Sequence, residues 1–278
     1  MQTTSGKTTK PIKTQTEIRP LSWPWVHLFQ PTHFIVRELA LPLEHLPMEL
    51  DGMRIAVLSD LHLTPVWHKA YERVLETVEA LATDMVLVTG DIVDDRRTHV
   101  PAMPVIRRYL PALRSRLGTF AILGNHDNIG SSQELDRLGI QMLDGRRILL
   151  ETGKGSVELI GAMGPMRADM PEGFAARFEA PTRGVPRIVL AHFPDFFPKL
   201  QSLQPDIYLC GHTHAGQICL PTGAMLVRHD HSPRKLCRGY HRIGPTHYIV
   251  NQGLGFSGVA IRLFCPPEIV LIILKRAY

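Results

Sequence analysis

The chain has 278 residues, of which 44% are hydrophobic, and its formal net charge is +5. This length and composition allow a large hydrophobic core and exclude a disordered chain, a collagen-like chain and a small disulfide-stapled protein. Four of the basic residues lie with a single acidic one in residues 1–20, so the rest of the chain is close to neutral. A nucleic-acid-binding protein needs a broad basic face, and we therefore expect no nucleic-acid partner.

The cysteines and the apolar segments predict a cytoplasmic protein. The four cysteines, at positions 210, 219, 237 and 265, form no CxxC pair, which favours reduced and partly buried thiols. No apolar run reaches the ~18 residues of a membrane-spanning helix. The N-terminal lysines are not followed by the apolar region of a signal peptide.

Composition divides the chain into a tail, an arm and a folded domain. Residues 1–20 are polar and predict a disordered basic tail. Residues 21–50 combine Trp23 and Trp25 with four prolines. Prolines oppose an amphipathic membrane anchor and favour an arm with an edge strand from His33 to Leu41, packed on residues 51–278. Peripheral membrane contact through residues 1–50 stays open, on the inner face of the membrane.

From residue 54 the pattern alternates between strands and helices. Apolar residues recur at helical spacing in residues 67–81, and a second helix is expected near 102–113. Short apolar runs predict strands at 54–59, 85–88, 119–123, 187–190, 206–210, 248–250 and 269–274. Strands that are apolar on both faces and separated by helices indicate an α/β sandwich with substantial parallel pairing.

Five of these strands end in a turn that carries His, Asp or Asn. Open α/β sheets bind ligands outside the carboxyl ends of their strands, so the five turns are expected to meet at one site. Carboxylates, imidazoles and an amide suit Zn, Mn or Fe ions, and the ligands are too many for one tetrahedral ion. The five groups are Asp60-x-His62, Gly90-Asp91-x-x-Asp94, Gly124-Asn125-His126-Asp127, His192 and Gly211-His212-x-His214.

These five motifs together resemble the calcineurin-like metallophosphoesterases. The sequences around Asp60, His212 and Arg262 are similar to the bacterial branch of small phosphodiesterases. The resemblance implies a four-layer α/β/β/α sandwich, a catalytic domain over residues 51–278, and a dinuclear metal phosphodiesterase that hydrolyses a phosphate ester. A hydroxide that bridges the two metal ions would attack phosphorus.

The resemblance also implies a role for each residue of the motifs. His126 would be the general acid, or the cation that stabilises the leaving oxygen. Asp127 or Asp94 could orient a neighbouring histidine or cap a helix, and Arg262 could bind a substrate phosphate or be a surface residue. The first metal would be held by Asp60, His62, Asp91 and His214, and the second by Asp91, Asn125, His192 and His212.

Two other functions compete with this interpretation. A pyrophosphatase of a nucleotide-linked lipid, acting on UDP-2,3-diacylglucosamine in lipid A biosynthesis, would use the apolar residues of 21–50 and a lid from residues 128–191. A non-catalytic metal-binding scaffold of the same fold would be indicated by loss of His126 or of a metal ligand. The sequence has lost none of these residues.

Overall fold

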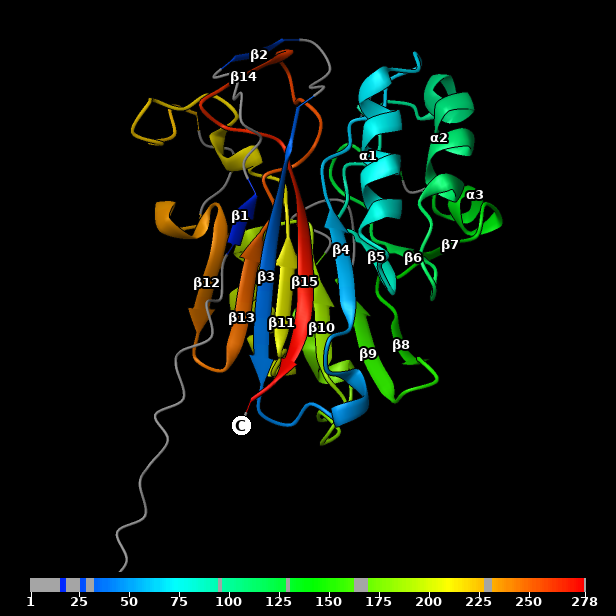
Figure 1. The fold of residues 1–278 in the computed structure, drawn as a ribbon, viewed down its shortest axis with the longest axis vertical. Coiled ribbons are helices and arrows are strands. Elements are labelled where there is room, and N and C mark those ends of the chain that lie inside the picture. The colour runs from blue at the N-terminus through cyan, green and yellow to red at the C-terminus, as the bar shows by residue number, and fades with distance from the viewer. Residues whose placement is uncertain are drawn as a thin grey trace, which may run out of the picture.

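The structure is a computed structural model that describes residues 16–18, 26–28, 33–94, 97–128, 131–162, 170–227 and 232–277. Its strands form two large sheets and a small two-stranded ribbon (Figure 1). The first sheet has the strand order β1 (Thr16–Ile18), β3 (Ile35–Leu43), β15 (Glu268–Arg276), β4 (Arg54–Leu58), β5 (Met85–Val88), β6 (Thr119–Ala121) and β7 (Ile140–Met142). The second has the order β12 (Gly239–Ile243), β13 (Thr246–Val250), β11 (Ile207–Cys210), β10 (Arg187–Leu190), β9 (Ser156–Gly161) and β8 (Arg147–Glu151). The ribbon pairs β2 (Val26–Leu28) with β14 (Ile261–Leu263).

Alternating side chains of the central strands reach two different cores. On β4, Ile55 and Val57 face the core between the two sheets, whereas Ala56 and Leu58 face the core under the helices. Helices α1 (Lys69–Ala80), α2 (Met103–Tyr109) and α3 (Ser131–Arg137) lie on that outer side (Figure 1). Successive side chains of a strand point to opposite faces, so strands covered on both sides read as continuous apolar runs.

The second sheet is covered in the same way. Leu190 and Leu209 point into the core between the sheets, while Val189 and Tyr208 pack on the outer face with α4 (Phe197–Leu200). The layers are therefore helix, sheet, sheet and helix. The predicted α/β/β/α sandwich is confirmed, as is its parallel pairing, which joins β4 to β5 to β6 and β9 to β10 to β11.

The N-terminal arm differs from its prediction. Strand β3 lies between β1 and β15 and pairs with β15 from Ile35 to Leu43, so it is an internal strand of the sheet and not an edge strand. The predicted boundary at residue 51 therefore cuts through the folded domain. Three residues of the predicted disordered tail, Thr16–Ile18, form β1. Residues 1–15, Trp23 and Trp25 lie outside the described residues.

The pyrophosphatase alternative assigns a lid to residues 128–191, and the described residues of this segment contribute strands. β7 extends the first sheet, and β8 and β9 extend the second. The sequence predictions omitted these three strands. Among the described residues, no helix combines the length and the apolar character that crossing a membrane requires.

Candidate metal centre

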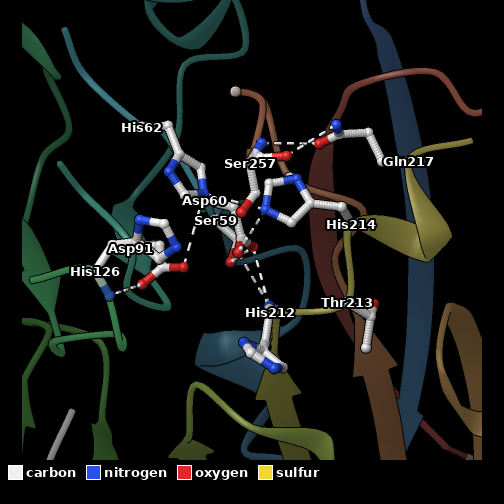
Figure 2. A network of polar contacts seen from close by, with 12 residues as sticks. Ser59, Asp60, His62, Asp91, His126, His212, Thr213, His214, Gln217 and Ser257 are labelled. Carbon is white, nitrogen blue, oxygen red and sulfur yellow. Dashed lines mark hydrogen bonds and ion pairs between the residues drawn. The ribbon is translucent and has the colours of Figure 1, made fainter. Parts of the chain in front are cut away.

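The predicted ligands come from both sheets and meet at the carboxyl ends of five strands. Asp60 and His62 follow β4, Asp91 follows β5, and Asn125 follows β6 in the first sheet. The second sheet contributes His192 after β10, and His212 and His214 after β11. Figure 2 shows the side chains of Asp60, His62, Asp91 and His214 gathered close together.

The backbone turns sharply at five of these residues. Positive φ angles are found at Asp60 (50°), His62 (44°), Asp91 (51°), His212 (68°) and His214 (48°). A left-handed backbone costs roughly 1–2 kcal/mol for a residue with a Cβ. Such strain persists only where the surroundings impose it, and it concentrates at functional sites.

The glycines of the motifs leave room that a side chain would fill. A Cβ at Gly90 would lie 2.7 Å from His192 Nδ1 and from the backbone nitrogen of Gly124. A Cβ at Gly124 would overlap the Asp91 carboxylate, and one at Gly211 would overlap Ser59 and Asp60. Glycine is therefore required at each position by the close approach of the ligand side chains.

The first cluster of potential ligands is fully buried. Asp60, His62, Asp91 and His214 present ligand atoms that lie within 4.8 Å of one another. His62 Nε2 is 3.1 Å from His214 Nε2 and 3.7 Å from Asp91 Oδ2, and His214 Nε2 is 3.4 Å from Asp60 Oδ1. Two ring nitrogens and two carboxylates aimed at one point are the donors that a divalent transition ion takes.

The second cluster shares Asp91 and adds His192 and His212. His192 Nδ1 contacts the carbonyl oxygen of Thr89 at 2.8 Å, so this nitrogen carries a proton. His192 Nε2 then faces two acceptors, Asn125 Oδ1 at 3.1 Å and Asp91 Oδ2 at 3.3 Å. If the ring were neutral, the lone pair of Nε2 would face the lone pairs of both oxygens. The arrangement therefore requires a cation at Nε2, either a proton or a metal ion. These residues fit a metal ion.

The charges of the cluster are strongly coupled. Burial alone would raise the pKa of Asp91, but His192 and His62 hold it well below its ordinary value. Burial would lower the pKa of His192, but the carboxylates of Asp91 and Asp60 raise it to about 9. The pKa of His214 is well below its ordinary value because of burial and because His62 and Arg262 are cationic neighbours.

Arg262 is neither a surface residue nor placed to bind a phosphate, and both predictions for it are wrong. Its side chain is fully buried, and Nη2 lies 2.9 Å from His214 Nδ1. The guanidinium also donates to the carbonyl oxygens of Gln252 and Gly255. Arg262 therefore fixes the orientation of a potential metal ligand from behind.

Asp94 acts on the opposite side of the same cluster. Its Oδ1 lies 3.2 Å from His62 Nδ1, so of its two predicted roles the structure shows the orienting one. A carboxylate on the far nitrogen holds a histidine in the tautomer that binds metal through Nε2. Ser59 Oγ donates to Asp60 Oδ2 at 2.5 Å and fixes that carboxylate in the same way.

His126 and Asp127 follow Asn125 but differ in what they contact. The backbone nitrogen of His126 donates to Asp91 Oδ1 at 2.7 Å, and its Nδ1 is 2.7 Å from the carbonyl oxygen of Asp94. Asp127 is buried and accepts hydrogen bonds from the backbone nitrogens of Ile92, Val93 and Gly124. Burial and the nearby Asp91 raise the pKa of Asp127 to about 7.

These contacts give Asp127 a structural role, whereas its predicted catalytic or histidine-orienting role stays a prediction. Its carboxylate joins the turn after β5 to the turn after β6 and so fixes the spacing between Asp91 and Asn125. A buried carboxylate satisfies several backbone N–H groups at once, which a prediction from neighbouring residues in the sequence does not reveal.

Sequence reasoning also missed a link between the two loops that surround His214. Gln217 donates through Nε2 to the carbonyl oxygens of Ser257 and Val259, and its Oε1 accepts from the nitrogen of Ser257 (Figure 2). The inward direction of Arg262 had a signal in the sequence, because the residue stands between Ile261 and Leu263 in an alternating strand.

Comparison with known proteins identifies the family to which the chain belongs. The model of the calcineurin-like phosphoesterase family matches residues 53–216. The metallophosphoesterase YkuE of Bacillus subtilis is 28% identical over 83% of this chain and 82% of its own length. The phosphodiesterase YaeI of Escherichia coli is 30% identical over 68% of this chain and 69% of its own.

A transmembrane protein with a metallophosphoesterase domain, from Danio rerio, is 30% identical over 87% of this chain. The match spans 57% of that relative's length. The family match covers more than half of the chain, and all five motifs lie within it. The chain belongs to the calcineurin-like phosphoesterase family.

Proposed function

We propose that the chain is a dinuclear metal-dependent phosphodiesterase. The observation that carries the proposal is the position of Asp91, whose Oδ2 lies 3.7 Å from His62 Nε2 and 3.3 Å from His192 Nε2. One carboxylate thus belongs to both clusters of potential ligands. A shared carboxylate is the simplest way to hold two cations a few ångströms apart.

Two divalent ions, when bound, would activate a water molecule as nucleophile and supply positive charge for the transition state. Asp60 and Asp91 are the carboxylates of the two clusters, and Asn125 adds a neutral amide oxygen. Two carboxylates do not cancel the charge of two divalent ions, so the centre keeps the positive charge that a phosphate ester requires. Mn, Zn and Fe all suit this set of donors.

His126 is the residue we assign to the leaving group. Its contact with the Asp94 carbonyl oxygen places a proton on Nδ1, so Nε2 is the ring nitrogen that titrates. The ring lies edge-on to His62, with centroids 4.6 Å apart, and its backbone is tied to Asp91. From this position Nε2 can donate a proton to the departing oxygen without serving as a metal ligand.

A cytoplasmic setting is part of the proposal. All four cysteines are free and buried. Cys219 and Cys265 donate to the carbonyl oxygens of Ala215 and His214, at 3.2 and 3.1 Å, so the thiols take part in the packing beside the metal centre. Free thiols persist in a reducing compartment.

The test is hydrolysis of bis-p-nitrophenyl phosphate by metal-stripped protein that has been reloaded with Mn, Zn or Fe. We expect turnover only after reloading, with two ions per chain by elemental analysis. Turnover that survives stripping, or one ion in the fully loaded protein, would contradict the dinuclear proposal. Monoesters and UDP-2,3-diacylglucosamine belong in the same panel, since much faster hydrolysis of the latter would favour the pyrophosphatase alternative.

A further inference from the structure

Exposed apolar side chains gather at the end of the molecule that carries the metal centre. Ten large hydrophobic side chains of the described residues are at least 40% exposed, and only Met48 and Leu149 lie away from this end. Seven of the others follow the carboxyl end of β4, β5, β11 or β13, and Val26 lies on the ribbon strand β2. They are Val26, Val66, Val100, Leu220, Leu226, Val227, Val259 and Ile261.

The ribbon of β2 and β14 has two different faces. Arg262 points inward to His214, and Ile261 and Leu263 on either side of it point the other way because side chains alternate along a strand. Val26 pairs with Leu263 and shares its outward face. Val26 is 47% exposed and Ile261 is 40% exposed, so the outward face is apolar and open to solvent. Figure 1 shows the ribbon beyond the tips of both large sheets.

The loop of residues 218–227 extends this face. The nitrogen of Cys219 donates to the carbonyl oxygen of Leu263 at 2.8 Å, so the loop is joined directly to β14. The nitrogen of Leu226 donates to the carbonyl oxygen of Ile218 at 3.0 Å and closes the loop. Its exposed side chains are Leu220, Leu226 and Val227. We define the docking face as Val26, Leu220, Leu226, Val227, Val259 and Ile261.

Basic residues flank the docking face. Residues 207–267 contain six lysines and arginines and a single acidic residue, Asp230. Arg262 among them is buried, and Arg242 donates to the carbonyl oxygen of Gly244 in the β12–β13 hairpin. The remaining described cations of this segment are Arg234, Lys235 and Arg238. Arg234 and Lys235 are exposed on the short helix Arg234–Leu236. The Arg238 guanidinium lies 3.0 Å from where a Cβ of Gly223 would stand, so this cation is beside the apolar loop. Apolar side chains flanked by cations are typical of surfaces that enter the headgroup region of anionic membranes.

We propose that the docking face binds an anionic lipid surface, and that the substrate is a phosphate ester of an amphiphilic lipid. The substrate assignment rests on the proposed phosphodiesterase function, whereas the docking does not. Arg262 joins the two events in space, because the strand that exposes Ile261 to the lipid also holds His214 in the metal centre. A headgroup phosphate at the lipid surface would then lie next to the metal ligands.

The test uses the full metal-loaded chain and flotation with phosphatidylcholine vesicles, with and without phosphatidylglycerol. We expect binding that requires phosphatidylglycerol. The double variant Leu226→Asp/Val259→Asp should weaken it by at least about tenfold, because two exposed apolar contacts are replaced by repelled charges. The matched control is Met48→Asp/Leu149→Asp, which changes two equally exposed apolar residues away from this end and should bind as the wild type does.

Turnover separates the substrate assignment from the docking. Both double variants should hydrolyse soluble bis-p-nitrophenyl phosphate at the wild-type rate and melt at the wild-type temperature. Hydrolysis of a phosphodiester lipid within anionic vesicles should fall with Leu226→Asp/Val259→Asp alone. Vesicle binding without turnover of either ester would overturn the phosphodiesterase function and the substrate assignment while supporting the docking.

Three results would overturn the docking itself. The first is wild-type protein that ignores anionic vesicles, and the second is equal weakening by both double variants. The third is a wild-type dimer in analytical ultracentrifugation that Leu226→Asp/Val259→Asp converts to a monomer, with no vesicle binding by either protein. In that case the face would bind a second copy of the chain.

Discussion

The two candidate metal positions share Asp91 but differ in how far they are enclosed. The first is made of Asp60, His62, Asp91 and His214, all of which are buried. The second adds Asn125 and His212, which are partly exposed. The first position is also surrounded by side chains that orient its ligands, whereas the described ring contact behind His192 is a backbone carbonyl.

This difference indicates a division of work between the positions. An enclosed set of ligands with fixed orientations holds an ion tightly and in one geometry. A partly exposed set allows exchange of the ion and approach of a substrate oxygen. We expect the first position to be the more tightly bound, and the second to be the one that solvent and substrate reach.

The largest loss of turnover is expected for substitution of Asp91, which the two metal positions share. Asp91→Ala should remove both ions and lower turnover of bis-p-nitrophenyl phosphate by at least roughly 10³-fold, since it deletes the shared carboxylate and the charge stabilisation that depends on it. Elemental analysis and kcat are the measurements, and Glu179→Ala, at a side chain that is 84% exposed, is the control. A variant that keeps one ion per chain would show that Asp91 is not shared.

Substitution of His126 tests whether a residue beside the first metal position takes part in catalysis. His126→Ala should keep both ions and the melting temperature but lower kcat by ~10²–10⁴-fold, the range for loss of a positioned acid. The loss should be smaller for a nitrophenyl ester than for an alkyl ester, because nitrophenolate leaves without a proton. Equal losses would indicate charge stabilisation instead, and His68→Ala serves as the control for removal of a histidine.

Asp94 sharpens the comparison because it acts on one position only. Asp94→Ala removes the contact with His62 Nδ1 but leaves the backbone contact to His126. Metal affinity of the first position should fall by about 10–100-fold, as for other carboxylates behind a metal-bound histidine. Titration with a competing chelator should show the second position unchanged, and equal weakening of both would refute the assignment.

The smallest effect is a difference in pH dependence. The pKa of His192 is raised to about 9, so below that pH its ring must lose a proton before it binds metal. The affinity of the second position should therefore rise with pH, by about tenfold per unit below pH 9. At the first position the low pKa of His214 leaves that ligand already deprotonated. Burial would lower the pKa of His62, but Asp94 and Asp91 raise it, so among the histidines of the first position the pH dependence is set by His62 alone. Calorimetry in buffers of different ionisation enthalpy would measure the proton released, and an affinity that is independent of pH would contradict the account of His192.

Most of the strands that sequence reasoning identified are buried on both faces, although the omitted strand β9 is buried as well. Met85–Val88 and Ile207–Cys210 are uninterrupted apolar runs, and both faces of each strand are covered. Arg147–Glu151 is half-exposed, and the polar residues at its ends conceal the pattern. Strand β3 was read as an edge because β1, which covers it, has only three residues and lies in a polar segment.

The sequence by itself determined which side chains gather at the site. Each motif is local, because a strand followed by a tight turn delivers its Asp, Asn or His to the carboxyl edge whatever the rest of the chain does. The tertiary structure alone decided what stands behind those side chains. Asp127 binds backbone nitrogens of another turn, and Arg262 reaches His214 across 48 positions. Such contacts depend on the register of strands and the direction of side chains between distant segments, which local spacing does not encode.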